Sequence, residues 1–444
     1  PPAAGGLVPL PDELPLTRQH YGLTTVSLFC QFVLQAATSM NGSSAVLSVL
    51  WPELEALGEI PHPTTGRTWI LRLGLYKLQR PKVKSDDWVW LADHVVQIGT
   101  EKVLNIVGVR LSDLPPRGEC LALKDLEPIA ILPVTTSNQQ VVHDQLEKLA
   151  KELGAPAAIL TDEGSDLLGG VQRFRKAHPE TSSYSDITHY GARLLKRRLE
   201  KNERWKEFCS QVGQTKFQTG QTELAFLTPP PQRSKARFMN LGSLLGWAQK
   251  ALAVLEQQPA EVLQFCTSER LDEKFVWLRA YETDLKTWLE YETILQAAFA
   301  VVRNEGYYRG VSGVVSDQTR PHVQSDAGEI LQSELLAFVA QQSSNVALGE
   351  RVPGSTEVLE SSFGRWKSLE GDHQKGGFTS LVLGYAALLG ETTPELIARA
   401  MACTPWKHVQ TWCTTHLGQT LQSKRMTAHH SVTSPSAQQN PEET

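Results

Sequence analysis

The sequence has no Cys-x-x-Cys pair, because its six cysteines are scattered over 444 residues. Scattered cysteines argue against a structural zinc site and a disulfide framework, and they favour a reducing compartment. No apolar run approaches the roughly 18–20 residues that a membrane span needs, and residues 1–6 lack the charged and apolar regions of a signal peptide. We therefore expect a cytoplasmic protein that does not enter a membrane.

The chain also lacks an overall excess of positive charge, since its formal net charge is −5. One block departs from this balance: residues 187–240 contain eleven Lys and Arg against four Glu. Such a block is either a solvated helix face or a surface that binds an anionic partner. The length and the ordinary apolar content predict a globular protein of two to four domains.

Residues 88–109 form two β-branched and aromatic runs joined by Gly-Thr-Glu, a pattern that predicts a hairpin of buried strands. Asp93 lies within the first of these apolar runs. An ionised carboxylate buried there costs several kcal/mol unless a partner compensates it, and a divalent cation is the strongest such partner. The alternative is an Asp that caps a turn or pairs with a Lys.

Strand-like segments follow at 128–134, 156–162 and 183–187, and they alternate with two helical segments. This order predicts an open mixed sheet with helices on its faces. From residue 188 to about 349 the pattern becomes helical, with long runs at 191–212, 241–256, 271–304 and 327–343. Further helices are expected around residues 359–366, 378–389 and 394–401.

Residues 21–80 have three helical segments, and the third begins at Pro63-Thr64-Thr65 and contains Arg67 and Arg72. A helix of this kind after two short ones is typical of a helix-turn-helix unit that reads DNA, with Thr65, Arg67 and Arg72 as contacts. The alternative is a three-helix bundle with a Trp in its core. A basic segment, residues 80–85, separates this unit from the predicted hairpin.

Three acids lie where this fold sketch brings them to one edge of the sheet. Asp93 is on the first strand, Asp162 ends the fourth, and Glu360 is on a helix after the helical block. Three carboxylates can hold two Mg²⁺ ions, and oxygen-only ligands suit Mg²⁺ or Mn²⁺ better than Zn²⁺.

With these motifs the chain resembles the DDE transposases of bacterial insertion sequences. Residues 88–94 look like the strand of the first aspartate, and residues 159–166 look like the strand and loop of the second. Glu360 and Lys367 are separated by six residues, a spacing that some of these transposases show. The Tyr and Arg expected in that subgroup are replaced by Pro353 and Thr356, and Asp166 and Glu357 are alternative second and third acids.

The resemblance implies an α/β protein: an RNase H-like mixed five-stranded sheet flanked by helices, an N-terminal helix-turn-helix unit, and a large all-α insertion before the final catalytic helix. It implies an enzyme that uses two Mg²⁺ ions per active site, with Mn²⁺ as an alternative, to cleave DNA at transposon ends and join it to target DNA. Asp93, Asp162 and Glu360 would be the metal ligands. The partners would be terminal repeats and target DNA, bound by a homodimer or a larger synaptic complex in the bacterial nucleoid. Two rivals are a non-catalytic DNA-binding protein of the same fold and a structure-selective nuclease.

The expected organisation is as follows: a lead-in at 1–20, the helix-turn-helix unit at 21–80, a linker at 81–87, the first part of the RNase H-like core at 88–187, the helical insertion at 188–350, the last part of the core with C-terminal helices at 351–418, and a disordered tail at 419–444.

Several other side chains have a functional and a structural interpretation. A DNA substrate would make phosphate contacts of Lys367 and of the basic cluster Arg193, Lys196, Arg197 and Arg198. Asp186 and His189 contact the metal site or DNA, or else Asp186 or Thr188 caps a helix. His94 shuttles protons or is a hydrogen-bonded core residue. Trp277 and Trp288 stack on a base or fill a helical core.

Overall fold

A five-stranded mixed sheet forms the centre of the computed structural model, which describes residues 20–53, 59–98, 101–134, 137–162, 164–232, 237–239, 241–370, 379–417 and 426–430. The strands are β1 (Trp88–Ile98), β2 (Glu101–Arg110), β3 (Glu127–Val134), β4 (Ala158–Thr161) and β5 (Ser182–Ser185). Their order is β3-β2-β1-β4-β5. β1 is antiparallel to β2, and β2 to β3, whereas β1, β4 and β5 are parallel. This is the RNase H-like sheet that the sequence predicts.

The helices fall into three groups. Beside the sheet lie α4 (Gln139–Leu153), α5 (Ser165–Ala177) and α14 (Glu357–Glu370). The insertion contains α6 (Ile187–Leu199), α7 (Glu203–Thr219), α8 (Gly242–Gln257), α9 (Ala260–Leu263), α10 (Ser268–Phe275), α11 (Glu282–Glu305), α12 (Val311–Thr319) and α13 (Asp326–Ser344). The two ends of the chain supply α1 (Leu23–Leu34), α2 (Met40–Leu50), α3 (Pro63–Gln79), α15 (Val382–Leu388), α16 (Pro394–Cys403) and α17 (Trp406–His416).

The side chains of β1 divide between two hydrophobic cores because successive strand residues point to opposite faces. Trp88, Trp90 and Ala92 pack in one core with residues of α4 and α5. Val89 and Leu91 belong to the other, larger core, which includes residues of α3, α14 and α15. A strand buried on both faces reads as a continuous apolar run, which explains its pattern in the sequence.

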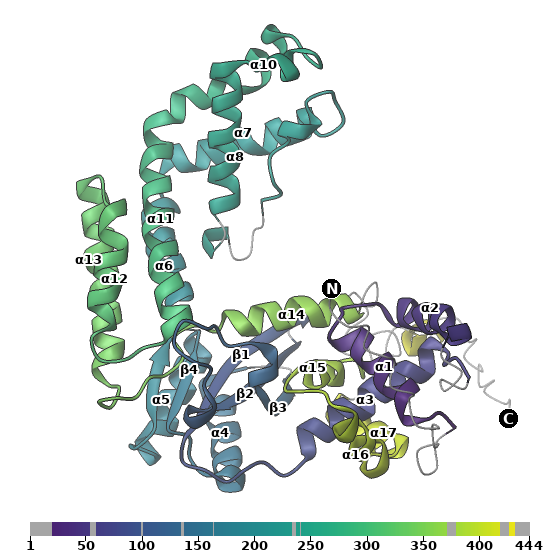
Figure 1. The fold of residues 1–444 in the computed structure, drawn as a ribbon. Coiled ribbons are helices and arrows are strands. Elements are labelled where there is room, and N and C mark those ends of the chain that lie inside the picture. Colours follow the sequence, from purple (N-terminus) through teal and green to yellow (C-terminus); the bar gives the residue numbers. More distant parts are fainter. Residues whose placement is uncertain are drawn as a thin grey trace, which may run out of the picture.

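The insertion leaves the sheet after β5 and returns to it at α14. Figure 1 shows α6 and α11 rising from the sheet, with α7, α8 and α10 at their far end and α12 and α13 beside them. The single helical run expected at 191–212 is two helices. α6 ends at Leu199, and Asn202 then caps α7 by accepting the backbone N–H of Trp205.

The first three helices do not stand apart from the rest of the protein. α3 packs against α15, α16, α17 and β3 (Figure 1). A Cβ atom added at Gly74 of α3 would lie 1.9 Å from the backbone oxygen of Leu383 in α15. Residues 21–80 therefore share one core with the C-terminal helices, and the predicted boundary at residue 80 does not separate two bodies.

Two cations of α3 are buried in this shared core. Arg72 is 6% exposed, and its guanidinium donates to the backbone oxygens of Thr404 and Met401. The Lys77 ammonium donates to the carbonyls of Leu389 at 2.6 Å and Ala387 at 3.1 Å and to the Thr392 hydroxyl. These bonds satisfy charges that would otherwise be costly to bury, so the two side chains hold the ends of the chain together.

The termini are only partly covered by the described residues. Of the predicted lead-in, only His20 is described, and of the predicted tail only residues 426–430, which are helical. The predicted linker is anchored: Arg80 and Lys82 both pair with Glu127 of β3 at 2.6 Å. No helix in the described residues has the length and apolar character needed to cross a membrane.

Gly74→Ala should destabilise the protein by about 1–3 kcal/mol, because the new methyl group forces α3 and α15 apart. Gly213 is a matched control, since it is also inside a helix but nothing lies within 4 Å of an added Cβ atom. Gly213→Ala should be neutral or stabilise by up to about 1 kcal/mol. Urea unfolding of both variants measures the difference. Equal stability would mean that α3 and α15 are not packed as described.

Candidate functional site

Strand alternation places Asp93 and Asp162 on the same face of the sheet. Asp93 continues the row of Val89 and Leu91 on β1, and Asp162 continues the row of Ala158 and Leu160 on β4; these four apolar residues belong to the core that includes α14. Ala92 and Thr161 are paired in the parallel register of β1 and β4. Asp93, in the middle of β1, and Asp162, just past the end of β4, therefore each come directly after one member of this pair and lie side by side on adjacent strands.

Helix α14 supplies the third predicted acid. Leu359, Phe363 and Trp366 of this helix are buried, and the Trp366 indole N–H donates to the carbonyl of Leu381 at 2.8 Å. This apolar stripe fixes the rotation of the helix and leaves Glu360 at the edge of the buried face, with 45% of its side chain exposed. Glu360 lies close enough to Asp93 for its charge to raise the pKa of the Asp93 carboxyl.

Burial raises the pKa of Asp93 from its ordinary range to about 7, and the charge of Asp162 acts in the same direction. Two features oppose this change: the charge of His189 and the hydrogen bond that Asp93 Oδ1 accepts from the backbone N–H of His94 at 2.6 Å. Asp93 is thus a desolvated carboxylate beside another acid, and a carboxyl with a pKa shifted in this way marks a candidate functional site.

Asp186 follows β5, the strand next to β4, but its carboxylate has a structural role. Its side chain is fully buried and caps α6 by accepting the backbone N–H groups of Thr188 and His189. Its other oxygen accepts the Thr356 hydroxyl at 2.6 Å and the Thr356 backbone N–H. With both oxygens occupied in this way, the helix-cap interpretation of Asp186 is confirmed.

His189 is the residue that this cap presents to the acids. Its Nε2 atom lies 3.7 Å from Glu360 Oε1, and the charge of His189 lowers the pKa values of both Asp93 and Glu360. Burial is the largest influence on Glu360 and raises the pKa of its carboxyl. The cluster therefore consists of Asp93, Asp162, Glu360 and His189, drawn from β1, the end of β4, α14 and α6.

The two alternative acids are engaged elsewhere. Asp166 Oδ1 accepts the backbone N–H of Leu167 at the start of α5, and Oδ2 lies 3.8 Å from His94 Nε2. Glu357 pairs with Arg303 of α11 at 2.8 Å. His94 also contacts the Ser137 hydroxyl at 2.9 Å, which fits a hydrogen-bonded core histidine.

The side chains of this cluster are of the chemical type that a hard divalent cation prefers, but they are not yet arranged around one position. Asn105 is paired opposite Asp93, and its buried Oδ1 atom has no hydrogen-bond partner. Directly opposed residues share a face, so this oxygen stands beside the Asp93 carboxylate. Within the described ranges, however, no three Asp, Glu, His or Cys side chains are already grouped around one metal position. The oxygen donors that a metal ion needs are therefore present, but the Glu360 carboxylate lies against His189 and is not grouped with the two aspartates.

The three predicted DNA contacts of α3 differ in their burial and in their hydrogen bonds. Arg72 is buried and bonded to carbonyls, so the structure assigns it to the fold, and the prediction of a DNA contact is wrong for this residue. Arg67 is half-buried and donates to the Ser380 hydroxyl at 3.0 Å. Thr65 is half-buried in the first turn of α3. The N-cap of this helix is His62, and Pro63 is its first residue.

The basic cluster of α6 is partly neutralised by one acid. Arg197 and Arg198 each pair with a different oxygen of Glu334 in α13, both at 3.0 Å, and only 17% of the Arg198 side chain is exposed. Lys196 pairs with Glu200 at 3.5 Å, and Arg193 lies over the ring of Tyr190. The exposed charge is therefore smaller than the sequence indicates. Nothing in the sequence pattern points to Glu334, which is far away along the chain.

The other predicted contacts are simpler. Lys367 is an exposed residue of α14. Trp288 is 3% exposed, and the Trp277 indole N–H donates to the Thr215 hydroxyl at 3.0 Å inside the insertion. The core interpretation of these two tryptophans is confirmed.

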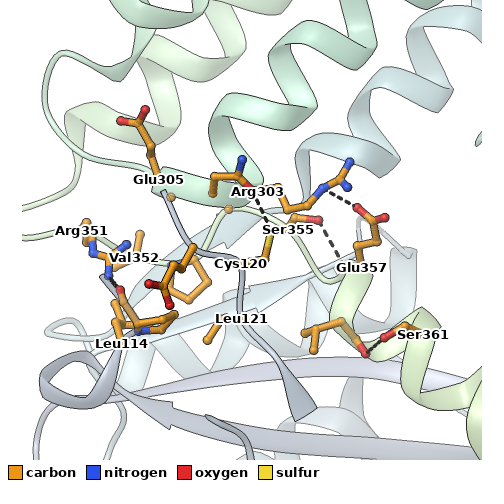
Figure 2. A pocket seen from close by; sticks show the side chains of 17 residues that line it. Leu114, Cys120, Leu121, Arg303, Glu305, Arg351, Val352, Ser355, Glu357 and Ser361 are labelled. Carbon is orange, nitrogen blue, oxygen red and sulfur yellow. Dashed lines mark hydrogen bonds and ion pairs between the residues drawn. The ribbon is translucent and has the colours of Figure 1, made fainter. Parts of the chain in front are cut away.

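Two cavities flank the start of α14. One, of about 380 Å³, lies between the insertion and α14 and is lined by Thr188, Phe299, Arg303, Glu357 and Glu360 among others. The other, of about 250 Å³, is also lined by Arg303 and Glu357, together with residues such as Cys120 and Arg351 (Figure 2). The candidate acid Glu360 therefore faces an open cleft roofed by the insertion.

Comparisons with known proteins give one similarity to report. No family model matches the chain, and no curated protein matches it. A solved structure of the Drosophila P element transposase strand transfer complex is similar at 13% sequence identity and a TM-score of 0.37, over 84% of this chain and 91% of that chain. A TM-score of this size carries no argument about function.

The difference in free energy of unfolding between Asp93→Asn and the wild type, measured without metal, should depend on pH. Because the folded-state pKa of Asp93 is raised, its contribution to stability is fully present below about pH 4 and is lost as pH rises towards 7. An Asn keeps the acceptor for the His94 N–H but never ionises. The variant should therefore gain about 2–4 kcal/mol over the wild type at pH 8 and little at pH 4. Urea unfolding in EDTA at both pH values tests this, and an equal difference at the two would contradict it.

Proposed function

We propose that this protein is a DDE-type DNA transposase, which cleaves DNA at the ends of a mobile element and joins the freed 3′ end to target DNA. The observation that supports it best is the convergence of Asp93, Asp162 and Glu360 on one face of an RNase H-like sheet, from β1, the end of β4 and α14. The raised pKa of Asp93 is consistent with a carboxylate that has a cation as its partner.

The three acids would hold two Mg²⁺ ions, or Mn²⁺ in their place. When bound, such ions polarise a phosphoryl oxygen and lower the pKa of a nucleophilic hydroxyl or water. The chain's own residues prepare this site: burial and the neighbouring Asp162 make the Asp93 carboxylate a strong ligand for a cation, and His189 holds Glu360 at the cleft.

DNA would approach through the cleft between the insertion and α14. Arg193, Lys196 and Arg197 on α6 and Lys367 on α14 would bind phosphates, whereas Arg198, being mostly buried against Glu334, contributes mainly to the packing of α6 on α13. Thr65 and Arg67 remain candidates for reading a terminal repeat, without Arg72. The enzyme would act as a homodimer or a larger synaptic complex on two element ends.

A second candidate is a DNA-binding protein that has lost catalysis. One observation favours it: among the residues that the structure describes, the acids are not grouped as a ready metal site. The two candidates predict different results for the same variants.

Asp93→Asn, Asp162→Asn and Glu360→Gln should each reduce strand cleavage in Mg²⁺ at least about 100-fold, because each removes one charged ligand while keeping the shape of the side chain. Gel analysis of a labelled element-end duplex measures cleavage and joining. Asp166→Asn and Glu357→Gln are matched controls that remove equally nearby charges and should retain cleavage.

Affinity for DNA distinguishes the candidates. A transposase binds DNA and loses only the chemistry in these variants. A wild-type protein that binds element ends but cleaves nothing in Mg²⁺ or Mn²⁺ supports the non-catalytic candidate. Loss of activity in Glu357→Gln with full activity in Glu360→Gln would mean that the third acid has been assigned one helical turn too late.

Arg193→Ala combined with Arg197→Ala should weaken binding to all DNA sequences about equally. It should also flatten the slope of log affinity against log salt concentration by about 1–2, since each lost phosphate contact releases about 0.9 fewer counterions. Fluorescence anisotropy at several salt concentrations measures both quantities. Glu334→Gln is the informative companion: it frees Arg197 and should steepen the slope. Unchanged affinity and slope in the double variant would mean that the cluster is only a solvated helix face.

A further inference from the structure

Arg303 is the one cationic side chain among the described residues that line the cleft at Glu360. It lies in the last turn of α11, where that helix returns to the sheet. Glu357 and Glu360 line the same cleft, so the entrance is rich in negative charge. A phosphate that reaches Glu360 would meet repulsion from these acids unless a nearby cation offsets it.

The Arg303 side chain is at present occupied by an acid of the protein. Its Nε atom lies 2.8 Å from Glu357 Oε2, in the first turn of α14. Figure 2 shows this pair linking α11 and α14, and both residues line both cavities. The side chains are 35% and 41% exposed. The Arg303 Nε atom itself is buried and has no hydrogen-bond partner, so its contact with Glu357 is a charge contact and not a well-aligned hydrogen bond. A partly exposed ion pair of this kind is weak, and exchanging one anionic partner for another costs little.

Guanidinium groups suit this exchange, because their planar donors match the oxygens of a carboxylate and of a phosphate equally well. The surrounding structure holds the two partners in place. The Glu357 backbone N–H donates to the Ser355 hydroxyl at 3.2 Å, and Asp186 anchors Thr356 beside it. Glu357 is thereby fixed within reach of Arg303.

We propose that Arg303 is a binding residue for a DNA phosphate next to the catalytic acids, and that Glu357 masks it until DNA enters the cleft. This inference rests on the proposed function and adds to it a specific contact and a competitor for that contact. The sequence contains no signal for it, since Arg303 and Glu357 are 54 residues apart and become neighbours only because α11 and α14 meet at the sheet.

The test is a double-mutant cycle on DNA binding, measured by fluorescence anisotropy with a labelled duplex of mixed sequence. Binding is measured in EDTA and again with Ca²⁺ in place of Mg²⁺, so that cleavage does not interfere. Arg303→Gln should weaken binding about 5- to 10-fold and lower the salt slope by about 1. Glu357→Gln should strengthen binding several-fold, because it releases Arg303.

The double variant Arg303→Gln with Glu357→Gln decides between masking and simple charge removal. If Glu357 masks Arg303, the double variant binds like Arg303→Gln alone. If Glu357→Gln strengthens binding equally in both backgrounds, the acid merely repels DNA and the proposal is overturned. Arg303→Lys checks the geometry: it keeps the charge and should restore the salt slope but only part of the affinity.

Lys286→Gln is a matched control, because it removes the same charge from the exposed surface of the same helix, 17 residues or about 26 Å from Arg303. It should leave affinity and slope unchanged. Thermal melts of every variant verify folding. If Arg303→Gln binds DNA as tightly as the wild type, the Arg303–Glu357 pair only stabilises the packing of α11 against α14. A wild-type chain that binds no DNA would overturn the proposed function itself, whereas normal binding with an inert Arg303 overturns this inference alone.

Discussion

The Asp186 carboxylate is the interaction on which the arrangement of the site depends. One oxygen caps the helix that begins the insertion, and the other binds Thr356 at the start of the helix that follows the insertion. A fully buried carboxylate is tolerated because backbone and hydroxyl donors surround it. The chain leaves the sheet and returns to it, more than 150 residues later, at one side chain. His189 and Glu360, which follow these two points, are brought together as a result.

Other contacts at the same place keep the return of the chain in register. The Tyr307 hydroxyl donates to the carbonyl of Ser185 at 2.9 Å, and Tyr307 pairs with Val352 in a short antiparallel bridge. The Ile187 backbone N–H donates to the carbonyl of Gly354. The insertion is thus fastened at its base by several elements, and a change of its orientation would be felt directly at α14.

The parts of the fold that follow local rules could be predicted from the sequence. The apolar runs of β1 and β2 and the Asn138 cap of α4 are local signals, and so is the position of Asp93 within a buried strand, whereas residues 99–100 of the predicted turn lie outside the described residues. Two outcomes depend on residues distant in sequence. Arg72 looks like a surface arginine until the carbonyls of Thr404 and Met401 surround it, and the charge of Arg197 and Arg198 looks available until Glu334 meets them. Single-sequence patterns contain no information about such pairings.

The burial of Arg72 and Lys77 has a consequence for how the protein is made. Their hydrogen-bond acceptors are in residues 387–404, near the end of the chain, so α3 emerges from the ribosome long before its partners exist. Until residues 387–404 have been synthesised, Arg72 and Lys77 have no acceptors, and the apolar face of α3 cannot be buried without cost. A product truncated before α15 therefore keeps this apolar face exposed, where proteases and chaperones can recognise it.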